Sequence, residues 1–168
     1  QWASLAKGPT AAERLKTGDV GAALASGAKR VEAAYEVPYL AHACMEPMNA
    51  TAHFKGDSCE IWASTQAQSW NQHWVSQLTG LPPKAITIHT TYLGGGFGRR
   101  LESDYVVEAV DVSRAAGNVP VKVVWTREDD IQHDFYRPAS HNLVQASLGA
   151  DGMPTAWSHR IVGTSILQ

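Results

Sequence analysis

The feature that most constrains this chain is a glycine-rich run at residues 91–100, with the sequence TYLGGGFGRR. An alternating apolar segment, residues 85–89, comes before it and predicts a strand. A helix-like pattern over residues 102–116 follows it. Glycine has no side chain, so the backbone of such a strand–loop–helix junction can approach a ligand closely. The helix start adds unpaired N–H groups and a partial positive charge, which favour an anion.

The residues of this loop leave two interpretations open, a tight turn or a ligand-binding loop. The common nucleotide-binding patterns do not fit. A G-x-G-x-x-G motif starting at Gly94 would need glycine at Arg99, and a P-loop would need lysine after Gly98. Phe97 is the unusual residue, because a large apolar ring stands among glycines. In a plain turn the ring would be exposed to water, which costs free energy. Beside a ligand the ring would line the binding site.

Size and charge exclude several classes of protein. The chain has 168 residues, 44% hydrophobic residues and a net charge of −2. We therefore predict one domain over 1–168, with residues 1–27 loosely packed, and no nucleic-acid partner. No apolar run has the length of a membrane span. The first residues resemble neither a signal peptide nor an initiator methionine, so we expect an internal segment of a longer protein.

The two cysteines, Cys44 and Cys59, fit no metal-binding spacing. We predict buried free thiols, with a single disulfide as the less favoured alternative.

Periodicity along the chain predicts an α+β fold. Strands are expected at 31–37, 51–55, 59–63, 85–89, 121–125, 142–148 and 156–163. A short helix is expected at 20–25, and two main helices at 65–79 and 102–116. The order gives a β-β-α-β-α-β core and a C-terminal hairpin. We therefore predict a mixed, mainly antiparallel sheet covered by helices.

Three local details of this prediction concern helices. Thr65 and Gln68 have the spacing of a capping box, which predicts the start of the first main helix. Trp70, Trp74 and Leu78 recur every four residues, and we interpret them as its buried stripe. Residues 126–130 are interpreted as a charged turn, in which Arg127 and Glu128 could pair.

Gln66 is the polar residue singled out by its position. It follows a strand and precedes a helix, as the glycine loop does at its own junction. If the strands 59–63 and 85–89 run parallel in one sheet, both junctions lie at the same edge, where α/β units bind ligands. The alternative is that Gln66 only helps to cap the helix, and spacing alone leaves the two interpretations even.

Other candidates for chemistry carry less weight. The chain has seven histidines, none of them in a metal-binding motif, so we predict no protein-ligated metal. A nucleophile elbow of the G-x-S-x-G type is also missing from the sequence. We expect Glu46 to bond backbone amides internally, in an irregular loop before Pro47, rather than to act as a catalytic carboxylate.

Taken together, these motifs resemble the molybdenum-binding subunit of the xanthine dehydrogenase/aldehyde oxidase family. The branch that contains isoquinoline 1-oxidoreductase beta subunits is the most similar. The runs that carry the resemblance are 42–52 (HACMEPMNATA), 64–66 (STQ), 93–100 (LGGGFGRR), 104–105 (DY) with 108–109 (EA), and 125–130 (WTREDD).

The resemblance implies a bacterial oxidoreductase that binds molybdopterin, as its cytosine dinucleotide. In the family, the glutamine of the S-T-Q motif lies beside an oxo ligand of the metal, and Gln66 matches it. The phenylalanine–glycine pair lies under the cofactor, and Phe97 and Gly98 match that pair. The cofactor-binding residues implied are Gln66, Gly95, Gly96, Phe97, Gly98 and Arg99.

The implied reaction is oxidative hydroxylation of an aldehyde or N-heterocycle, with water as the oxygen source. The implied partners are the remainder of the large subunit and a separate iron–sulfur subunit. The family's general-base glutamate lies beyond Gln168, so this segment holds no catalytic residue and is expected to be inactive and without cofactor when isolated. Leu101 stands where purine-oxidising members carry a glutamate, which argues against a purine substrate. The alternative is a structural or docking subdomain of the same subunit without direct cofactor contact.

Overall fold

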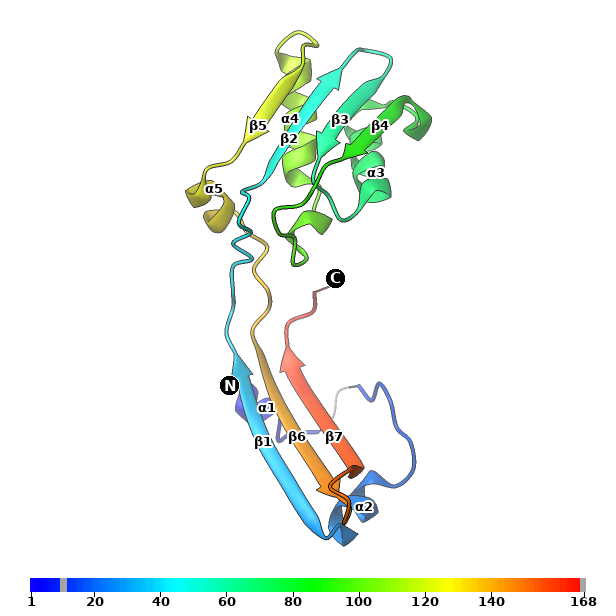
Figure 1. The fold of residues 1–168 in the computed structure, drawn as a ribbon, viewed down its shortest axis with the longest axis vertical. Helices are drawn as coiled ribbons and strands as arrows, with labels where there is room; N and C mark the ends of the chain where they lie inside the picture. Colours follow the sequence, from blue (N-terminus) through cyan, green and yellow to red (C-terminus); the bar gives the residue numbers. More distant parts are fainter. Residues whose placement is uncertain (10–11, 167–168) are drawn as a thin grey trace. The chain divides into compact units, whose positions relative to one another are not determined.

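A computed structural model of the chain describes residues 1–9 and 12–166 (Figure 1). Its internal contacts form two compact units, Gln1–Leu40 with Arg137–Gln168 and Ala41–Tyr136. The single domain over 1–168 and the loose packing of residues 1–27 stay predictions. Within the described ranges, every helix is too short or too polar to cross a membrane.

The unit Ala41–Tyr136 contains a four-stranded sheet in the order β4-β3-β2-β5. Its strands are β2 (Asn49–Phe54), β3 (Cys59–Ala63), β4 (Ile86–Thr90) and β5 (Val121–Val124). The hairpin pair β2 and β3 is antiparallel, as is the pair β2 and β5. The pair β3 and β4 is parallel, because a helix carries the chain back between them.

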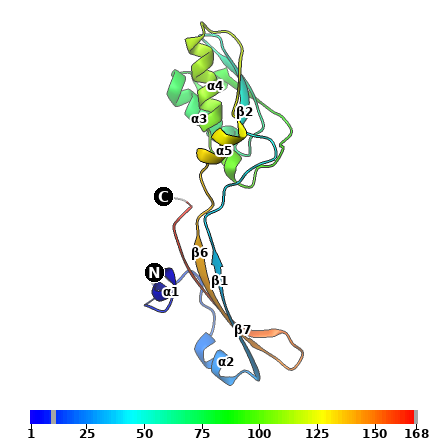
Figure 2. The ribbon, with the colours of Figure 1, turned by 90° about the vertical axis from the view of Figure 1, so that its left-hand side faces the viewer.

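Two helices, α3 (Gln68–Thr79) and α4 (Asp104–Ala115), pack on one face of this sheet (Figures 1 and 2). The α4 helix buries Tyr105, Val106, Ala109 and Val110, which confirms the predicted face. These side chains join a core that includes Ile61 of β3. Burial of each large aliphatic side chain stabilises the fold by about 1.5–3 kcal/mol.

The predicted buried stripe of α3 is wrong. Trp70 and Trp74 are 58% and 45% exposed. The helix buries Asn71 and Val75, and Leu78 packs partly against the core. An i, i+4 spacing identifies a helical face but not its partner, so a face of large aromatic rings can lie outside the core.

The predicted capping box of α3 is also wrong. Its N-cap is Ala67, without a side-chain cap. The Thr65 hydroxyl instead accepts a hydrogen bond from Asn71 Nδ2 (2.7 Å) and donates one to the carbonyl of Arg100 (3.2 Å). The same hydroxyl accepts a hydrogen bond from the Ala67 N–H (3.0 Å), so Thr65 joins the segment before α3 to Arg100 rather than capping the first turn of the helix.

Residues 126–130 form the start of a short helix, α5 (Arg127–Gln132), rather than a turn. Thr126 caps it in a reciprocal capping box with Asp129. Arg127 pairs with Asp130 at 2.9 Å, one helical turn away.

The other unit contains a three-stranded antiparallel sheet, in the order β1-β6-β7. Its strands are β1 (Lys29–Val37), β6 (Ser140–Leu148) and β7 (Pro154–Gly163). Two short helices, α1 (Trp2–Leu5) and α2 (Val20–Ser26), belong to the same unit. Asp19 caps α2 by accepting a hydrogen bond from the Ala22 N–H.

The α+β class is confirmed, and so is the element order β2-β3-α3-β4-α4-β5. Short 3₁₀ turns, η1 (Pro83–Ala85) and η2 (Arg99–Leu101), precede β4 and α4. The strands form two sheets rather than one, because β1 pairs with β6 of the C-terminal hairpin. Cys44 and Cys59 are free and buried, as predicted, and burial raises the pKa of the Cys59 thiol to about 11.

Candidate functional site

The parallel pair β3 and β4 brings the two predicted junctions to one edge of the sheet. Their last paired residues are Ala63 and Thr90. Gln66 follows β3 and the glycine loop follows β4. The two strands run parallel in one sheet, as the sequence argument for a shared edge required. The strand ends thus place both segments where ligands commonly bind in α/β units.

A direct hydrogen bond joins the two segments. The backbone N–H of Gly98 donates to Oε1 of Gln66 at 3.2 Å. The approach is close at Gly96 as well, where an added Cβ would lie 2.5 Å from the same oxygen. Gln66 itself is exposed, and its backbone N–H donates to the Arg100 carbonyl at 3.1 Å. Glycine at 96 therefore lets the loop pack directly against the carboxamide of Gln66.

Phe97 presents its ring to the surface beside this contact. Its φ of 55° lies in the left-handed region, which is rare for a bulky residue, and its neighbours Gly95 and Gly98 also have positive φ. The residue is 75% exposed, and Tyr92 and Leu93 of the same loop are exposed too. An exposed apolar ring held in a strained conformation is characteristic of a functional surface.

The carboxylate of Glu46 holds the backbone of the glycine loop. Its Oε2 accepts hydrogen bonds from the Gly94 N–H and from Arg100 Nη2, both at 2.9 Å. The predicted internal bonding to a backbone amide is thus confirmed. Burial works to raise the pKa of Glu46, but hydrogen bonds from Asn49 and Gly94 and the charge of Arg100 outweigh it, so the pKa lies below its ordinary value.

Arg100 is a supporting residue that the sequence did not identify. It is fully buried and donates to the Gly95 carbonyl (2.8 Å) and the Ser64 hydroxyl (2.7 Å), besides Glu46. One side chain therefore links the glycine loop to the segment before Gln66. Its partners lie far away in the sequence, so linear spacing gave no signal for it.

Arg99 points into the interior. Its guanidinium makes two hydrogen bonds to Asp104 (2.9 and 2.7 Å) and lies 3.3 Å from Asp134. It also lies over the rings of Trp125 and Phe135, at 5.4 and 5.2 Å from their centroids. Any ligand contact by Arg99 therefore falls to its backbone.

His42 is a second residue near the loop that sequence reasoning missed. Its Nδ1 lies 2.9 Å from Oδ1 of Asp134. Its Nε2 lies 3.6 Å from the position that a Cβ on Gly98 would occupy. Its segment is irregular, as predicted, and this contact joins residues 92 positions apart, so no local pattern could have shown it.

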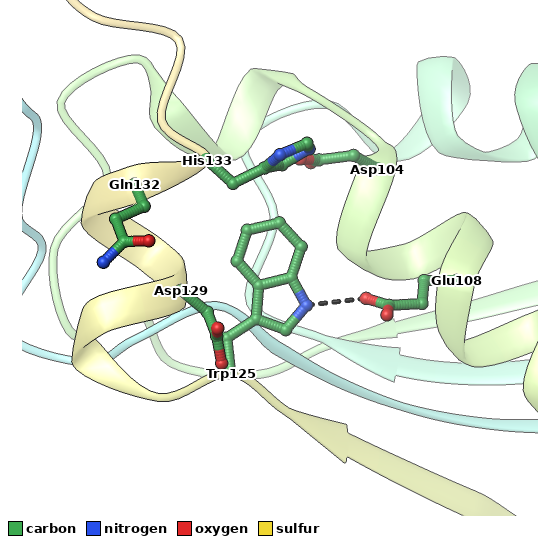
Figure 3. A pocket seen from close by; sticks show the side chains of 6 residues that line it. All are labelled: Asp104, Glu108, Trp125, Asp129, Gln132 and His133. Carbon is green, nitrogen blue, oxygen red and sulfur yellow. Dashed lines mark hydrogen bonds between the residues drawn. The ribbon is translucent and has the colours of Figure 1, made fainter.

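An open cleft of about 680 Å³ lies near α4 and α5 (Figure 3). Three carboxylates, one imidazole and two further side chains line it: Asp104, Glu108, Asp129, His133, Trp125 and Gln132. The three carboxylates already have partners. They accept hydrogen bonds from Arg99, from the indole N–H of Trp125 (2.6 Å) and from Thr126, respectively. Across residues 1–9 and 12–166, no cluster of His, Cys, Asp or Glu is arranged to hold a metal ion.

The residues at the glycine loop fit a flat, polar organic ligand. Phe97 offers an apolar face, and the backbone at the positive-φ residues Gly95 and Gly98 has no side chains that would block approach. The Gln66 carboxamide offers its exposed amide edge beside them. Few convergent polar groups beside an apolar surface are typical of cofactor sites.

Fold and site together define an α+β segment in which a hydrogen bond joins a glycine loop to a glutamine side chain. The Molybdopterin cofactor-binding domain family matches residues 5–165. The chain belongs to this family. Its relatives include proteins named as oxidoreductases and dehydrogenases.

Two relatives illustrate the similarity. The isoquinoline 1-oxidoreductase subunit beta of Brevundimonas diminuta is 38% identical over 125 residues, which are 73% of this chain and 16% of that protein. The aldehyde oxidoreductase molybdenum-binding subunit PaoC of Escherichia coli K12 is 34% identical over 146 residues, 84% of this chain and 19% of that protein. This chain thus spans less than a fifth of the length of these relatives.

Solved structures show the same fold. Quinoline 2-oxidoreductase from Pseudomonas putida 86 superposes with a TM-score of 0.68 at 22% identity, covering 85% of this chain and 18% of that one. Aldehyde oxidoreductase from Desulfovibrio gigas gives a TM-score of 0.66 at 23% identity, covering 86% and 16%.

Proposed function

We propose that this chain is the part of an oxidoreductase subunit that holds molybdopterin, as its cytosine dinucleotide, beside an aldehyde or N-heterocycle. The observation that carries the proposal is the Gly98–Gln66 hydrogen bond, with the exposed ring of Phe97 next to it. The residues proposed to hold the cofactor are Gln66, Gly95, Gly96, Phe97, Gly98 and, through its backbone, Arg99.

Each residue of the loop has a distinct task in this proposal. Phe97 covers an apolar face of the ligand and excludes water from it. The Gly98 N–H holds Oε1 of Gln66, which turns the amide NH₂ of that side chain outward as a donor. The Glu46–Arg100 pair keeps the backbone of the loop in place beneath. When bound, the cofactor supplies the Lewis-acid and redox chemistry that oxidises a carbon with oxygen from water.

The substrate class rests on relatives and on one position of the loop. The names of the relatives include an isoquinoline oxidoreductase and an aldehyde oxidoreductase. Leu101, which is half exposed, follows the arginines at the end of the loop. An apolar side chain there offers no carboxylate to orient a purine, so we propose a less polar aldehyde or heterocycle. An iron–sulfur subunit and the remainder of the large subunit are the proposed partners.

The second candidate function is that of a docking subdomain. The exposed tryptophans of α3, Trp70 and Trp74, favour it, because large exposed aromatic rings are enriched at protein interfaces. In that case the segment would hold its neighbours together and would not touch the cofactor.

Metal analysis and turnover of the full-length subunit separate the two functions. We expect the variants Gln66→Ala and Phe97→Ala to lower molybdenum and pterin content, or turnover of aldehydes and N-heterocycles, by at least tenfold. Gln77→Ala, an exposed glutamine on α3, is the matched control and should behave like the parent protein. Unchanged cofactor content and unchanged turnover in both site variants would support the docking function instead.

A further inference from the structure

His42 is held at two points by one carboxylate. Asp134 accepts a hydrogen bond from the backbone N–H of His42 and lies 2.9 Å from its ring nitrogen Nδ1. The side chain of Asp134 is 1% exposed and that of His42 is 12% exposed. The imidazole therefore has little freedom to turn.

The carboxylate that holds His42 is itself fixed by a chain of charges. Asp134 lies 3.3 Å from Nε of Arg99, and Arg99 makes two hydrogen bonds to Asp104 at the start of α4. Arg99 is the residue that follows Gly98, so this buried chain ties the orientation of the imidazole to the end of the glycine loop. Such support is typical of residues whose direction matters.

The hydrogen bond to Asp134 determines what the other ring nitrogen can do. An ionised carboxylate only accepts hydrogen bonds, so Nδ1 of His42 carries the proton and Nε2 of the neutral ring is an acceptor. Among the described residues, Nε2 has no hydrogen-bond partner, and it lies 3.6 Å from the position that a Cβ on Gly98 would occupy. Glycine at 98 leaves the space beside Nε2 open.

We propose that His42, oriented by Asp134, binds the ligand of the glycine loop by accepting a hydrogen bond at Nε2. This inference rests on the proposed function, in which that ligand is a pterin cofactor. Gly98 then lies beside an acceptor, His42 Nε2, and its N–H holds Oε1 of Gln66, whose amide NH₂ remains as a donor. A ligand that carries both a donor and an acceptor, as a lactam does, satisfies both groups.

The opposing possibility is that the His42–Asp134 pair only joins two loops, and two amide substitutions distinguish the cases. His42→Asn keeps a polar group near Nδ1, so it retains the Asp134 contact but lacks the ligand contact. His42→Gln places its amide oxygen near Nε2, so it retains the acceptor for the ligand. His89→Gln is the matched control, because His89 is an exposed histidine whose Nε2 lies 3.0 Å from Glu60.

The experiment uses the full-length subunit in its complex and measures the rate at which pterin and molybdenum are lost on dilution. We expect roughly tenfold faster loss in His42→Asn, the effect of one buried hydrogen bond, and a rate near that of the parent in His42→Gln and His89→Gln. Asp134→Asn, which no longer fixes the tautomer, should also lose cofactor faster. Melting temperatures of the cofactor-free variants report any effect on folding.

Three results would overturn the inference. A rate of cofactor loss in His42→Asn equal to that of the parent would show that His42 does not contact the ligand. Cofactor loss at the parent rate in His42→Asn together with faster loss in His42→Gln would assign the pair a purely structural role. A parent protein that never contains pterin would overturn the proposed function together with this inference. That result is distinguishable from the other two because it is seen in the parent protein, without any substitution.

Discussion

Replacement of Gly94 by alanine should damage the glycine loop severely. An added Cβ would lie 2.4 Å from Cβ of Glu46, about 1 Å closer than ordinary contact, and 3.1 Å from its Oε2. Glu46 cannot turn away at low cost, because its backbone N–H donates to the Gly94 carbonyl (3.0 Å) and its carboxylate holds Gly94 and Arg100.

The cost follows from two terms. Overpacking of a well-packed site costs about 1–3 kcal/mol. Weakening a hydrogen bond to a charged group adds about 1.5–3 kcal/mol. Because the same shift of Glu46 causes both, we expect about 3–5 kcal/mol in total, lost from the free energy of local opening of the loop.

Amide hydrogen exchange of the peptide that covers residues 91–100 measures this opening. We expect at least hundredfold faster exchange in Gly94→Ala. Gly96→Ala is the matched control, since its Cβ would meet the flexible end of Gln66, at 2.5 Å from Oε1. That side chain can move aside at the cost of one hydrogen bond, about 0.5–1.5 kcal/mol. Equal exchange in the two variants would refute the reasoning that Glu46 is fixed.

The remaining predictions concern charge. The folded-state pKa of Glu46 is lowered, so its stabilising contribution is present above its ordinary value of 4.5 and is lost as the pH falls through the lower folded value. The melting temperatures of the parent and of Glu46→Gln should therefore converge as the pH falls from 6 to 3, and a constant gap would contradict this. Arg99→Met removes the buried cation that makes two hydrogen bonds to Asp104 and lies 3.3 Å from the buried carboxylate of Asp134, and it should cost about 3–5 kcal/mol. Arg30→Met, which removes the exposed Arg30–Glu32 pair, should change stability by less than about 1 kcal/mol in the same thermal unfolding assay, and similar losses would contradict the role of burial.

Local periodicity identified most elements of the fold. Alternation over residues 59–63 and 85–89 and the apolar face of residues 105–110 correspond to β3, β4 and α4. Such patterns are readable because each element must present one apolar face to a core. The same rule gave a wrong prediction for α3, because Trp70 and Trp74 share a helical face that does not pack against the core.

Partners distant in sequence could not be predicted. The pairing of β1 with β6 joins residues more than a hundred positions apart, such as Ala33 with Val144. Arg100 and Glu46 are 54 positions apart, and His42 and Asp134 are 92 apart. Each of these contacts depends on how the whole chain folds, and no local spacing records it.

The sequence by itself determined that residues 94–98 form a loop in which Phe97 carries the only side chain, with Gln66 at a second junction of the same kind. Glycine and the strand–helix pattern act locally, so their consequences are visible in linear order. Only the tertiary structure decided that the parallel β3–β4 pair brings both junctions together, that Arg100 and Glu46 support the loop, and that Arg99 faces inward while Phe97 faces outward. Those outcomes depend on buried charges finding partners from other segments, because burying a charge without a partner is too costly to persist.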